Sequence, residues 1–598
     1  MYSQFLVPEY FYRPTKAIEM TGSRERRERE RVREGVPRMR AAPSASNPRP
    51  SARPSAVGRA APLGSGSLPL LGHLLAVRKN PLAVMRRIHD ECGEAGVMNL
   101  AGSRITLFYG AEAQEAFFRA PEEQLDQAAA YPFMAPIFGP GVVFDATPEQ
   151  RKQAMRNQSL RDNMMRGHAE GISREVRRMM GDWGESGELE LYDFFSELTL
   201  YTSSASLIGK SFRDELGPEI APLFKDLERG TDALAYVNPH LPIPVFWKRD
   251  RARRQMVEAL EKIFARRASD QAEHSDLFQI LHGLEDKEGK RRYSDEQITG
   301  MFISMMFAGH HTSSTVGSWC LLELLMNPHW MTEVQTELDE LYKDGRDVSY
   351  QALREIPILE RCLKESLRMH PPLVLLMRRV VENPYRYKDV EVPVGEIVAV
   401  SPAVSNRMPE YFPDPERFDP DRYAGDRNED RQLFSWIPFG GGRHRCVGAA
   451  FAMMQLKAIF SIVLEEYEFE MVGPLADYGN DYSTMVIGLK QPCRVKYRRR
   501  KSARAHHVAS PHDDSEDTTA RLDALAARPY CIKVDLDLCQ GHGVCVNEAP
   551  EIFELDDDAF KVRILNERPD PNHRPPIESA IRNCPTRAIR LIENPQER

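Results

Sequence analysis

Long apolar runs are absent from this sequence. A membrane-spanning helix needs about 18 or more consecutive apolar residues, and none of the 598 residues begins such a run. Residues 1–20 also lack the charged-then-apolar order of a secretory signal. We therefore expect a cytoplasmic protein without a transmembrane anchor, with peripheral contact with a membrane as the alternative.

The sequence contains few cysteines, and its net charge is small. The nine cysteines are an odd number spread over a long chain, which is not typical of a disulfide framework and favours a reducing compartment. The 80 basic and 88 acidic side chains leave a net charge of only −8, so we expect no nucleic-acid partner, which would require a basic surface. The hydrophobic content of 42% excludes a wholly disordered chain.

Two segments are too poor in large apolar side chains to fold on their own. Residues 1–62 are predicted to be a tail, in which residues 21–60 contain eleven arginines, four glutamates and an Ala/Pro/Ser-rich stretch. This tail either attaches weakly to anionic lipid or an acidic partner, or has no role. Residues 498–528 change from basic to acidic and are predicted to be a linker.

The remaining sequence predicts two folded parts of very different size. Residues 63–497 contain long segments rich in Met, Leu and Phe, such as 294–328, and only a few short β-type runs, which predicts a mainly α domain with small β-sheets. Residues 529–598 are predicted to form a small α+β domain. So short a domain usually needs a covalent or metal staple, and it contains four of the nine cysteines.

The most informative string is FGGGRHRCVG, residues 439–448. Its cysteine, Cys446, lies among glycines and basic side chains, directly before an apolar helical run. Glycines let the backbone approach a flat cofactor closely, and a helix N-terminus with cationic neighbours favours a thiolate over a thiol. A thiolate axial ligand on haem iron favours O–O cleavage. Taken alone, a buried structural cysteine is the competing interpretation.

This string resembles the cysteine-ligand loop of the cytochrome P450 family, FxxGx(H/R)xCxG, at every specified position. Glu365 and Arg368 resemble that family's ExxR pair, and Arg417 in the tetrapeptide PERF resembles the arginine that completes a buried ionic cluster with them. The resemblance implies the cytochrome P450 fold and a haem b whose iron is bound by Cys446. Haem carboxylates need cationic or phenolic partners when they are buried. The haem contacts that the resemblance implies are Tyr131, Lys152, Arg378, Phe439, Gly442 and His444.

Two further stretches resemble the sterol 14α-demethylase branch of that family. Residues 131–145, YPFMAPIFGPGVVFD, resemble its substrate-recognition segment, and residues 307–314, FAGHHTSS, resemble its oxygen-activation helix. Most of the wider family has an acidic residue before the threonine of this helix, where this chain has His311. Plain core packing is the competing reading of the apolar side chains. The residues implied to line a sterol-sized cavity are Tyr131, Phe133, Met134, Phe138, Ala308, Leu376 and Met485.

The oxygen-activation stretch has a chemical rationale in proton delivery. Splitting O₂ requires two protons to reach a largely apolar pocket, so a hydroxyl and an ionisable group must lie beside the iron. Thr312 and His311 meet this need if Gly309 lets the helix open locally. By resemblance, His311 pairs with Glu228 on a substrate-channel helix, so the predicted catalytic residues are Thr312, His311 and Glu228.

The cysteines near the C-terminus have the spacing of an iron–sulfur site. Cys539 and Cys545 form C-x5-C, followed 38 residues later by Cys584 and a proline, a pattern that resembles single-cluster bacterial-type ferredoxins. Where a four-iron protein has its middle cysteine, this chain has His542, which favours a [3Fe-4S] cluster held by three cysteines. A [4Fe-4S] cluster with His542 as its fourth ligand is an alternative. Zinc, bound by Cys531, Cys539, His542 and either Cys545 or Cys584, is another.

Together these resemblances imply an oxidoreductase of sterol biosynthesis with its electron donor fused on. Three O₂-dependent oxidations would remove the 14α-methyl group of a lanosterol-type sterol as formate. We find no G-x-G-x-x-G after a strand, so an NAD(P)H-dependent flavoprotein reductase is an expected partner. The alternatives are a haem monooxygenase for another hydrophobic substrate, such as a terpenoid or fatty acid, and a haem and iron–sulfur redox sensor.

Overall fold

The computed structural model describes most of the chain beyond residue 57. The described residues are 58–146, 162–217, 220–269, 276–285, 289–442, 445–501, 530–536, 538–539, 541–556, 561–584, 586 and 588–593. Gly58–Arg598 belong to one compact unit. The backbone N–H of Arg59 donates to Asp389, so the end of the predicted tail 1–62 is already part of this fold. Residues 1–57 and most of the predicted linker 498–528 lie outside the described residues.

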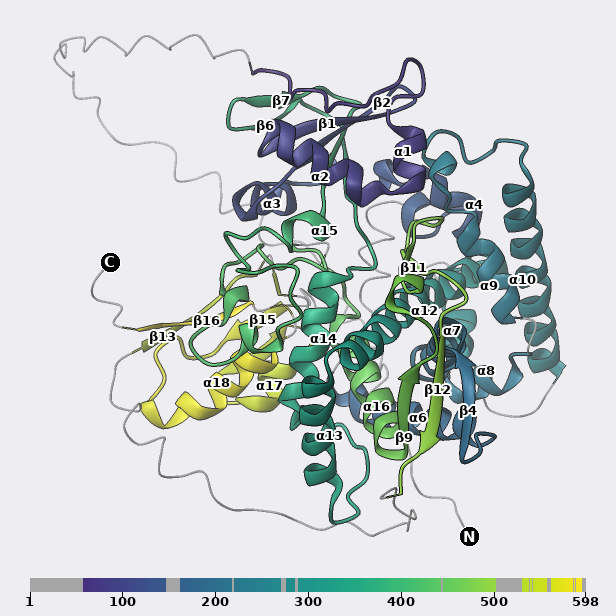
Figure 1. The fold of residues 1–598 in the computed structure, drawn as a ribbon, viewed down its shortest axis with the longest axis vertical. Coiled ribbons are helices and arrows are strands. Elements are labelled where there is room, and N and C mark those ends of the chain that lie inside the picture. Colours follow the sequence, from purple (N-terminus) through teal and green to yellow (C-terminus); the bar gives the residue numbers. More distant parts are fainter. Residues whose placement is uncertain are drawn as a thin grey trace, which may run out of the picture. The chain divides into compact units, whose positions relative to one another are not determined.

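The larger part is mainly helical with small sheets, as predicted (Figure 1). Its helices are α1 Leu74–Lys79, α2 Pro81–Cys92, α3 Ala111–Arg119, α4 Ala135–Phe138, α6 Asp162–Met180, α7 Leu191–Ser203, α8 Lys210–Glu215, α9 Ile220–Arg229, α10 Pro244–Ser269, α11 Leu277–Gly283, α12 Asp295–Met326, α13 Pro328–Tyr342, α14 Pro357–Met369, α15 Pro402–Ser405 and α16 Ala449–Glu466. Helix α12 packs against α7, α10, α14 and α16 and is the centre of this helical layer.

The strands of the larger part form a mixed sheet and several smaller ones. The mixed sheet has the order β1-β2-β8-β5-β3, with β2 and β8 parallel and the other neighbours antiparallel. An antiparallel sheet of order β4-β12-β9 and the pairs β6-β7 and β10-β11 complete the set. The strands are β1 Ala95–Leu100, β2 Ser103–Phe108, β3 Leu125–Asp126, β4 Ser186–Glu190, β5 Leu376–Val380, β6 Tyr385–Tyr387, β7 Val390–Val392, β8 Ile397–Val400, β9 Tyr467–Met471, β10 Asn480–Asp481, β11 Gly488–Leu489 and β12 Arg494–Arg499.

Helix α12 is long because local sequence and packing agree. Ser294 and Gln297 form a capping box at its N-terminus, which satisfies backbone donors that would otherwise be free. At 32 residues it is about 48 Å long, and most of its central side chains are buried on all sides. It ends at Asn327-Pro328, where the proline cannot continue the helical hydrogen bonds.

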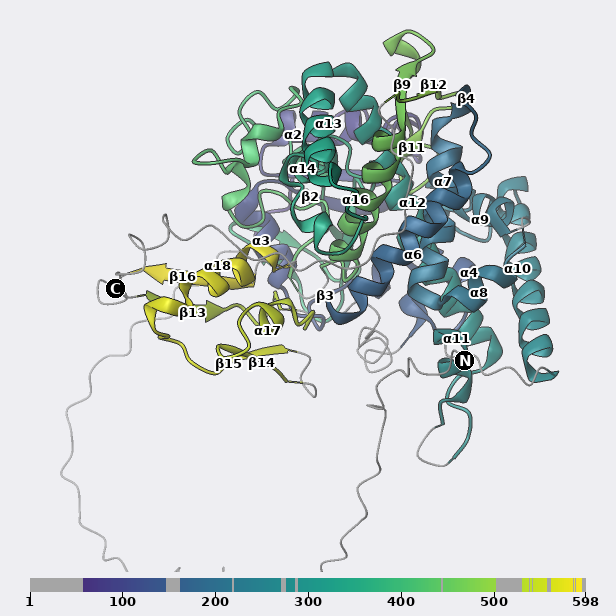
Figure 2. The same cartoon turned by 90° about the horizontal axis from the view of Figure 1, so that it is seen from below.

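The smaller part is an α+β unit, shown in yellow in Figure 2. Its chain ends pair as antiparallel strands, with Tyr530 opposite Glu593 and Val534 opposite Ile589. A second antiparallel pair, β14-β15, contacts β13 through β15; α18 packs against β16, and α17 packs against α18 and β14. The elements are β13 Tyr530–Val534, α17 Val544–Glu548, β14 Phe553–Asp556, β15 Lys561–Ile564, α18 Arg574–Asn583 and β16 Ile589–Glu593.

We searched the described helices for one that could cross a membrane and found none. Within the described residues, every helix is either too short or too polar to span a bilayer. Even α12, the longest, contains polar and charged side chains along its length.

Candidate functional site

Cys446 occupies a tight loop directly before α16. Its backbone N–H donates to the carbonyl of Phe439 at 2.9 Å, which closes the loop, and α16 begins at Ala449. Gly442 in this loop has φ +60°, and an added Cβ would lie 2.4 Å from the carbonyl oxygen of Phe118. A side chain at position 442 would therefore strain both the backbone and the contact with α3. Glycine at this position lets the loop lie against the end of α3.

Protein atoms surround the thiol of Cys446, but part of this residue is still exposed. Burial raises its pKa, and the backbone N–H of Gly448 and the charge of Arg445 act against this rise without cancelling it. The loop backbone and its cationic neighbour therefore favour a thiolate, as expected, but they do not outweigh burial when no metal ion lies beside the sulfur. A metal ion would deprotonate the thiol directly. An open sulfur in a glycine-lined loop fits an axial haem ligand.

Arg378 on β5 lies beside the same loop. Its Nη1 donates to the carbonyl of Phe117 at 2.7 Å, and its guanidinium lies 4.7 Å from the Phe117 ring. The hydroxyl of Tyr131 accepts the backbone N–H of Met377, the neighbour of Arg378, at 3.0 Å. Burial raises the pKa of Tyr131 to about 12, so its hydroxyl keeps its proton at neutral pH. A cationic and a phenolic group thus lie together, as haem carboxylates require.

Two other predicted haem contacts, Lys152 and His444, lie outside the described residues.

Ala308 and Thr312 interrupt the buried surface of α12. Ala308 is exposed and Thr312 is half-buried, whereas their neighbours Phe307 and His311 are buried. Residues 308 and 312 are one turn apart and share a helix face. The Thr312 hydroxyl donates to the Ala308 carbonyl at 2.8 Å. This face of α12 is therefore open in the middle of an otherwise buried helix.

Gly309 does not open α12 locally. The helix is continuous from Asp295 to Met326. An added Cβ at position 309 would lie 3.0 Å from Ser203 Oγ on α7. The expectation of a local opening is wrong in this structure, and Gly309 instead permits close packing of α7 on α12.

His311 and Glu228 form a buried pair between α12 and α9. His311 Nδ1 lies 3.2 Å from Glu228 Oε2. Burial, and secondarily the charge of Asp481, raise the pKa of Glu228 to about 8, while Lys225 and Arg229 act in the opposite direction. Burial and the neighbouring His310 hold the pKa of His311 well below its usual value. Burial thus disfavours the charged form of both side chains and favours a protonated carboxyl beside a neutral imidazole.

His310 has a different environment from its neighbour. Its Nδ1 lies 3.2 Å from the hydroxyl of Thr199 on α7, and burial lowers its pKa to about 3. In contrast, within the described part of the chain neither ring nitrogen of His311 has a hydrogen bond of good geometry. His310 is therefore a hydrogen-bonded core side chain, whereas His311 is the histidine that lies beside Glu228.

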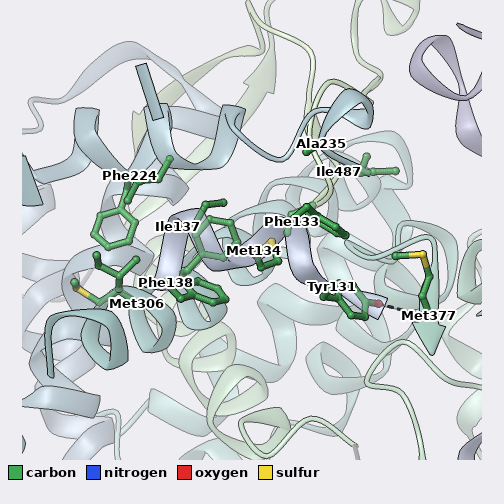
Figure 3. Close-up of a cluster of buried hydrophobic side chains, with 14 of the residues drawn as sticks. Tyr131, Phe133, Met134, Ile137, Phe138, Phe224, Ala235, Met306, Met377 and Ile487 are labelled. Carbon is green, nitrogen blue, oxygen red and sulfur yellow. Dashed lines mark hydrogen bonds between the residues drawn. The ribbon is translucent and has the colours of Figure 1, made fainter. Parts of the chain in front are cut away.

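The predicted cavity residues on the 131–138 segment belong to one apolar cluster (Figure 3). Tyr131, Phe133, Met134 and Phe138 are all buried in it. The Phe138 ring lies 5.7 Å from the ring of Phe307, edge to face, and thereby connects this segment to α12. The Phe133 ring lies 4.3 Å from that of Tyr236 in a short 3-10 helix, Ala233–Tyr236.

The remaining predicted cavity residues reach the site from two other directions. Met485 is half-buried against the same cluster, and its backbone N–H donates to the Thr231 hydroxyl, just after α9. Leu376, at the start of β5, is half-buried but packs against a different cluster, which includes Phe117 and Phe118. Leu376 therefore packs with the residues around Arg378 and not with the aromatic segment 131–138.

Glu365 and Arg368 on α14 are fully buried and doubly hydrogen-bonded to each other, with both N···O distances 2.8 Å. The arginine that completes this cluster is Arg422, whose Nε lies 2.9 Å from Glu365 Oε1. Arg417 is exposed and contributes only its carbonyl oxygen. The prediction for Arg417 is therefore wrong. The segment contains two similar tetrapeptides, PERF at 415–418 and PDRY at 420–423, and the second one enters the core.

Tyr423 of this second tetrapeptide donates its hydroxyl to Glu365 at 2.9 Å. The sequence motifs did not indicate that Tyr423 belongs to the buried cluster.

The three predicted cluster cysteines line one cavity in the small domain. Cys539 and Cys545 are buried, and Cys584 is half-buried. Backbone N–H groups of Val562 and Ala588 lie 3.4 Å from the sulfurs of Cys539 and Cys584. Burial and the neighbouring thiols raise the pKa of Cys545 to about 12, so three thiolates at this spacing need a cationic centre between them.

Within the described residues, which include all the candidate ligands of the zinc alternative, no three His, Cys, Asp or Glu side chains are grouped around one metal-ion position. Cys531 is on β13, paired with Ile592 of β16, and does not line the cavity.

His542 also lines this cavity, but its Nε2 lies 3.1 Å from the carbonyl oxygen of Val447. Val447 directly follows Cys446. Nothing in the motif spacing indicated this contact.

Comparison with known families agrees with both parts. Residues 62–492 match the family model "Cytochrome P450", and the chain belongs to that family. Residues 532–591 match a "4Fe-4S single cluster domain". The chain is thus a cytochrome P450 joined to a single-cluster iron–sulfur domain.

Its similarity to individual proteins is more specific. The chain is 54% identical over 445 residues to the sterol 14α-demethylase of Mycobacterium tuberculosis, which covers 74% of this chain and 98% of the relative. It is 36% identical to the sterol 14-demethylase of Arabidopsis thaliana, over 72% of this chain and 90% of the relative. The human lanosterol 14-alpha demethylase is 32% identical, over 72% of this chain and 85% of the relative.

Solved structures support the fold. A retinoic acid-bound cyanobacterial CYP120A1 superposes with a TM-score of 0.65 at 23% identity, covering 74% of this chain and all of that one. A cytochrome P450DA haem domain gives 0.64 at 20% identity, covering 75% of this chain and 99% of that one.

Proposed function

We propose that this chain is a sterol 14α-demethylase that receives electrons through its own iron–sulfur domain. The 54% identity to a mycobacterial sterol 14α-demethylase over nearly the whole relative is the observation that carries the proposal. The Cys446 loop, the open face of α12 and the buried aromatic segment supply the parts that such an enzyme needs. The bound haem would supply O₂ activation through its thiolate-ligated iron.

Each site residue would have a role that follows from its position. Cys446 would hold the iron, and Tyr131 and Arg378 would neutralise the haem carboxylates at one edge. Thr312 would present its hydroxyl to the reacting oxygen, and the Glu228–His311 pair would supply protons from the protein interior. The apolar segment from Tyr131 to Phe138 would exclude water and orient a rigid hydrophobic substrate against α12.

The overall reaction is a sequence of three oxidations at one methyl group. Each would consume one O₂ and two electrons, and the carbon would leave as formate with a 14,15 double bond in the sterol. Six electrons must therefore arrive for each product. A fused donor raises the effective concentration of the electron carrier, which favours such a repeated delivery. An NAD(P)H-dependent flavoprotein reductase would reload the iron–sulfur domain.

For the iron–sulfur domain we propose a [3Fe-4S] cluster held by Cys539, Cys545 and Cys584. Three cysteines line the cavity, and the Nε2 atom of His542 is engaged by Val447. A [4Fe-4S] cluster would need a fourth ligand, for which His542 has only Nδ1 left. The cluster would carry single electrons between the reductase and the haem.

The test combines the purified full chain with NADPH, a compatible reductase and lanosterol. We expect formate and the demethylated sterol in equal amounts, together with a spectral shift of the haem when the sterol binds. If lanosterol and its 4-monomethylated relatives give neither product nor shift, while a terpenoid or fatty acid gives both, the substrate class is wrong.

A further inference from the structure

We propose that His542 fastens the cluster-binding loop to the haem-ligand loop and thereby positions the two centres for electron transfer. This inference rests on the proposed delivery of electrons through the iron–sulfur domain, and it assigns that delivery to one contact. It concerns a residue that sits in the cluster motif where a cysteine ligand is expected.

The hydrogen bond determines what His542 can do. Its Nε2 lies 3.1 Å from the carbonyl oxygen of Val447. A carbonyl oxygen only accepts, so Nε2 must carry the proton and donate it. A nitrogen that carries a proton cannot bind iron at the same time. The bond that attaches the imidazole to the haem-ligand loop therefore removes Nε2 as an iron ligand and leaves only Nδ1.

The hydrogen bond between His542 and Val447 connects the two proposed metal sites. Val447 is bonded to Cys446, the haem ligand, and His542 lies between the cluster ligands Cys539 and Cys545. Both His542 and these cysteines line the same cavity. The contact therefore joins Val447, the neighbour of Cys446, to His542 in the wall of the cluster cavity. It provides a short connection between the haem-ligand loop and the cluster site.

Two ion pairs also join the P450 part to the iron–sulfur part. Arg119 at the end of α3 pairs with Asp535 after β13 at 2.9 Å, and Arg354 pairs with Glu548 at the end of α17. Both ion pairs have their cation on the P450 part and their anion on the iron–sulfur part. Partly exposed ion pairs guide an approach more than they fix it. The directional hydrogen bond of His542 would select one docked orientation among those that the charges permit.

Apolar side chains from both parts also belong to one buried cluster. It includes Phe118 and Phe434 of the P450 part, whose rings stack at 5.9 Å, and Leu538 and Cys539 of the iron–sulfur part. The interface thus combines an apolar centre with the flanking ion pairs, as in other protein interfaces.

The electron step itself involves no bond or proton. With both groups bound, the reduced cluster would supply one electron and the ferric haem would accept it, and NAD(P)H would reduce the cluster again through the flavoprotein reductase.

The test uses three variants of the full chain: His542→Ala removes the donor, His542→Gln retains an N–H group near the position of Nε2, and His573→Ala removes a histidine of the same domain that pairs with Glu551 instead. Haem reduction is followed by carbon monoxide trapping with the reductase and NADPH, and electron paramagnetic resonance follows the cluster. We expect the alanine variant at position 542 to lower the rate by up to about tenfold, with an unchanged cluster signal. Gln at this position should restore most of the rate, and His573→Ala should leave it unchanged.

A second readout is independent of turnover. Hydrogen exchange in residues 539–546 and 445–450 should speed up in His542→Ala and return toward wild type in His542→Gln. A changed cluster signal in His542→Ala would show that the residue is a ligand, and unchanged rate and exchange would show that the contact positions nothing; either result overturns the proposal. Because carbon monoxide trapping needs no sterol, a wrong substrate assignment does not affect the outcome. If the wild type itself transfers no electron, the proposed electron delivery fails, and this inference fails with it.

Discussion

Glu228 Oε2 lies 3.2 Å from His311 Nδ1, across the boundary between α9 and α12. Both side chains are buried, and burial keeps the proton on the carboxyl and off the imidazole at neutral pH. The pair is therefore a stored proton next to its acceptor and one residue from Thr312. This arrangement can release a proton toward the open face of α12 without carrying net charge in the resting protein.

Glu228→Gln should change how stability depends on pH. The folded-state pKa is raised from 4.5 to about 8, so the stabilising contribution of the proton is complete below 4.5 and is lost as the pH rises through 8. Glutamine has no such loss. Denaturant unfolding at several pH values should show wild-type stability falling relative to the variant between these limits. Parallel pH profiles for the two proteins would show that the carboxyl is not protonated in the fold.

Thr312→Ala should separate oxygen consumption from product formation. Removing the hydroxyl leaves the apolar pocket intact but removes a proton donor beside the iron, and such groups contribute about 10²–10⁴-fold to rates. We expect sterol binding close to wild type and product formation lower by roughly 10²-fold, with NADPH consumption diverted to peroxide. Thr312→Ser keeps the hydroxyl and serves as the control. Equal losses in the two variants would assign the effect to packing.

Arg422→Ala should be far more destabilising than Arg417→Ala. Arg422 is completely buried on Glu365, and removing one partner of a buried pair costs about 3–5 kcal/mol. Arg417 is exposed and uses only its backbone oxygen, so its truncation should cost within about 0.5 kcal/mol. Free energies of unfolding for both variants, with the haem content of the purified proteins, test this. Similar losses in the two variants would contradict the assignment of Arg422.

Cys446→Ala should abolish the reduced carbon-monoxide band that thiolate ligation produces, together with all sterol turnover. Alanine supplies no iron ligand, so the thiolate–iron bond is lost. Cys92→Ala, which removes a half-buried thiol on α2, is the control and should leave the band unchanged. A band that persists in Cys446→Ala would mean that another group binds the iron.

The iron–sulfur domain should give a three-iron electron paramagnetic resonance signal in the oxidised protein. Cys545→Ala should abolish it because that thiol lines the cluster cavity, whereas Cys531→Ala should not because Cys531 lies on β13 outside it. Iron and sulfide analysis of the same samples gives the cluster composition. A silent oxidised spectrum with four irons per domain would establish the four-iron alternative.

Local motifs carried most of what could be predicted. The loop around Cys446 and the spacing of Cys539, Cys545 and Cys584 are informative because ligands must be presented by short, specific backbone turns. For the small domain the sequence predicted only an α+β fold, and the structure shows that its two ends pair as the strands β13 and β16. Resemblance to a family, and not spacing, proposed Glu228 as the partner of His311.

The sequence by itself thus determined the fold class, and its motifs indicated Cys446, Cys539, Cys545 and Cys584 as candidate iron ligands. Tertiary structure decided which of two similar tetrapeptides reaches Glu365, that Gly309 packs against α7, and that His542 donates to Val447. The reason is physical: ligand loops and helix faces depend on neighbours in the chain, whereas these contacts join residues far apart in sequence. Only the packing of whole elements brings such residues within hydrogen-bond distance.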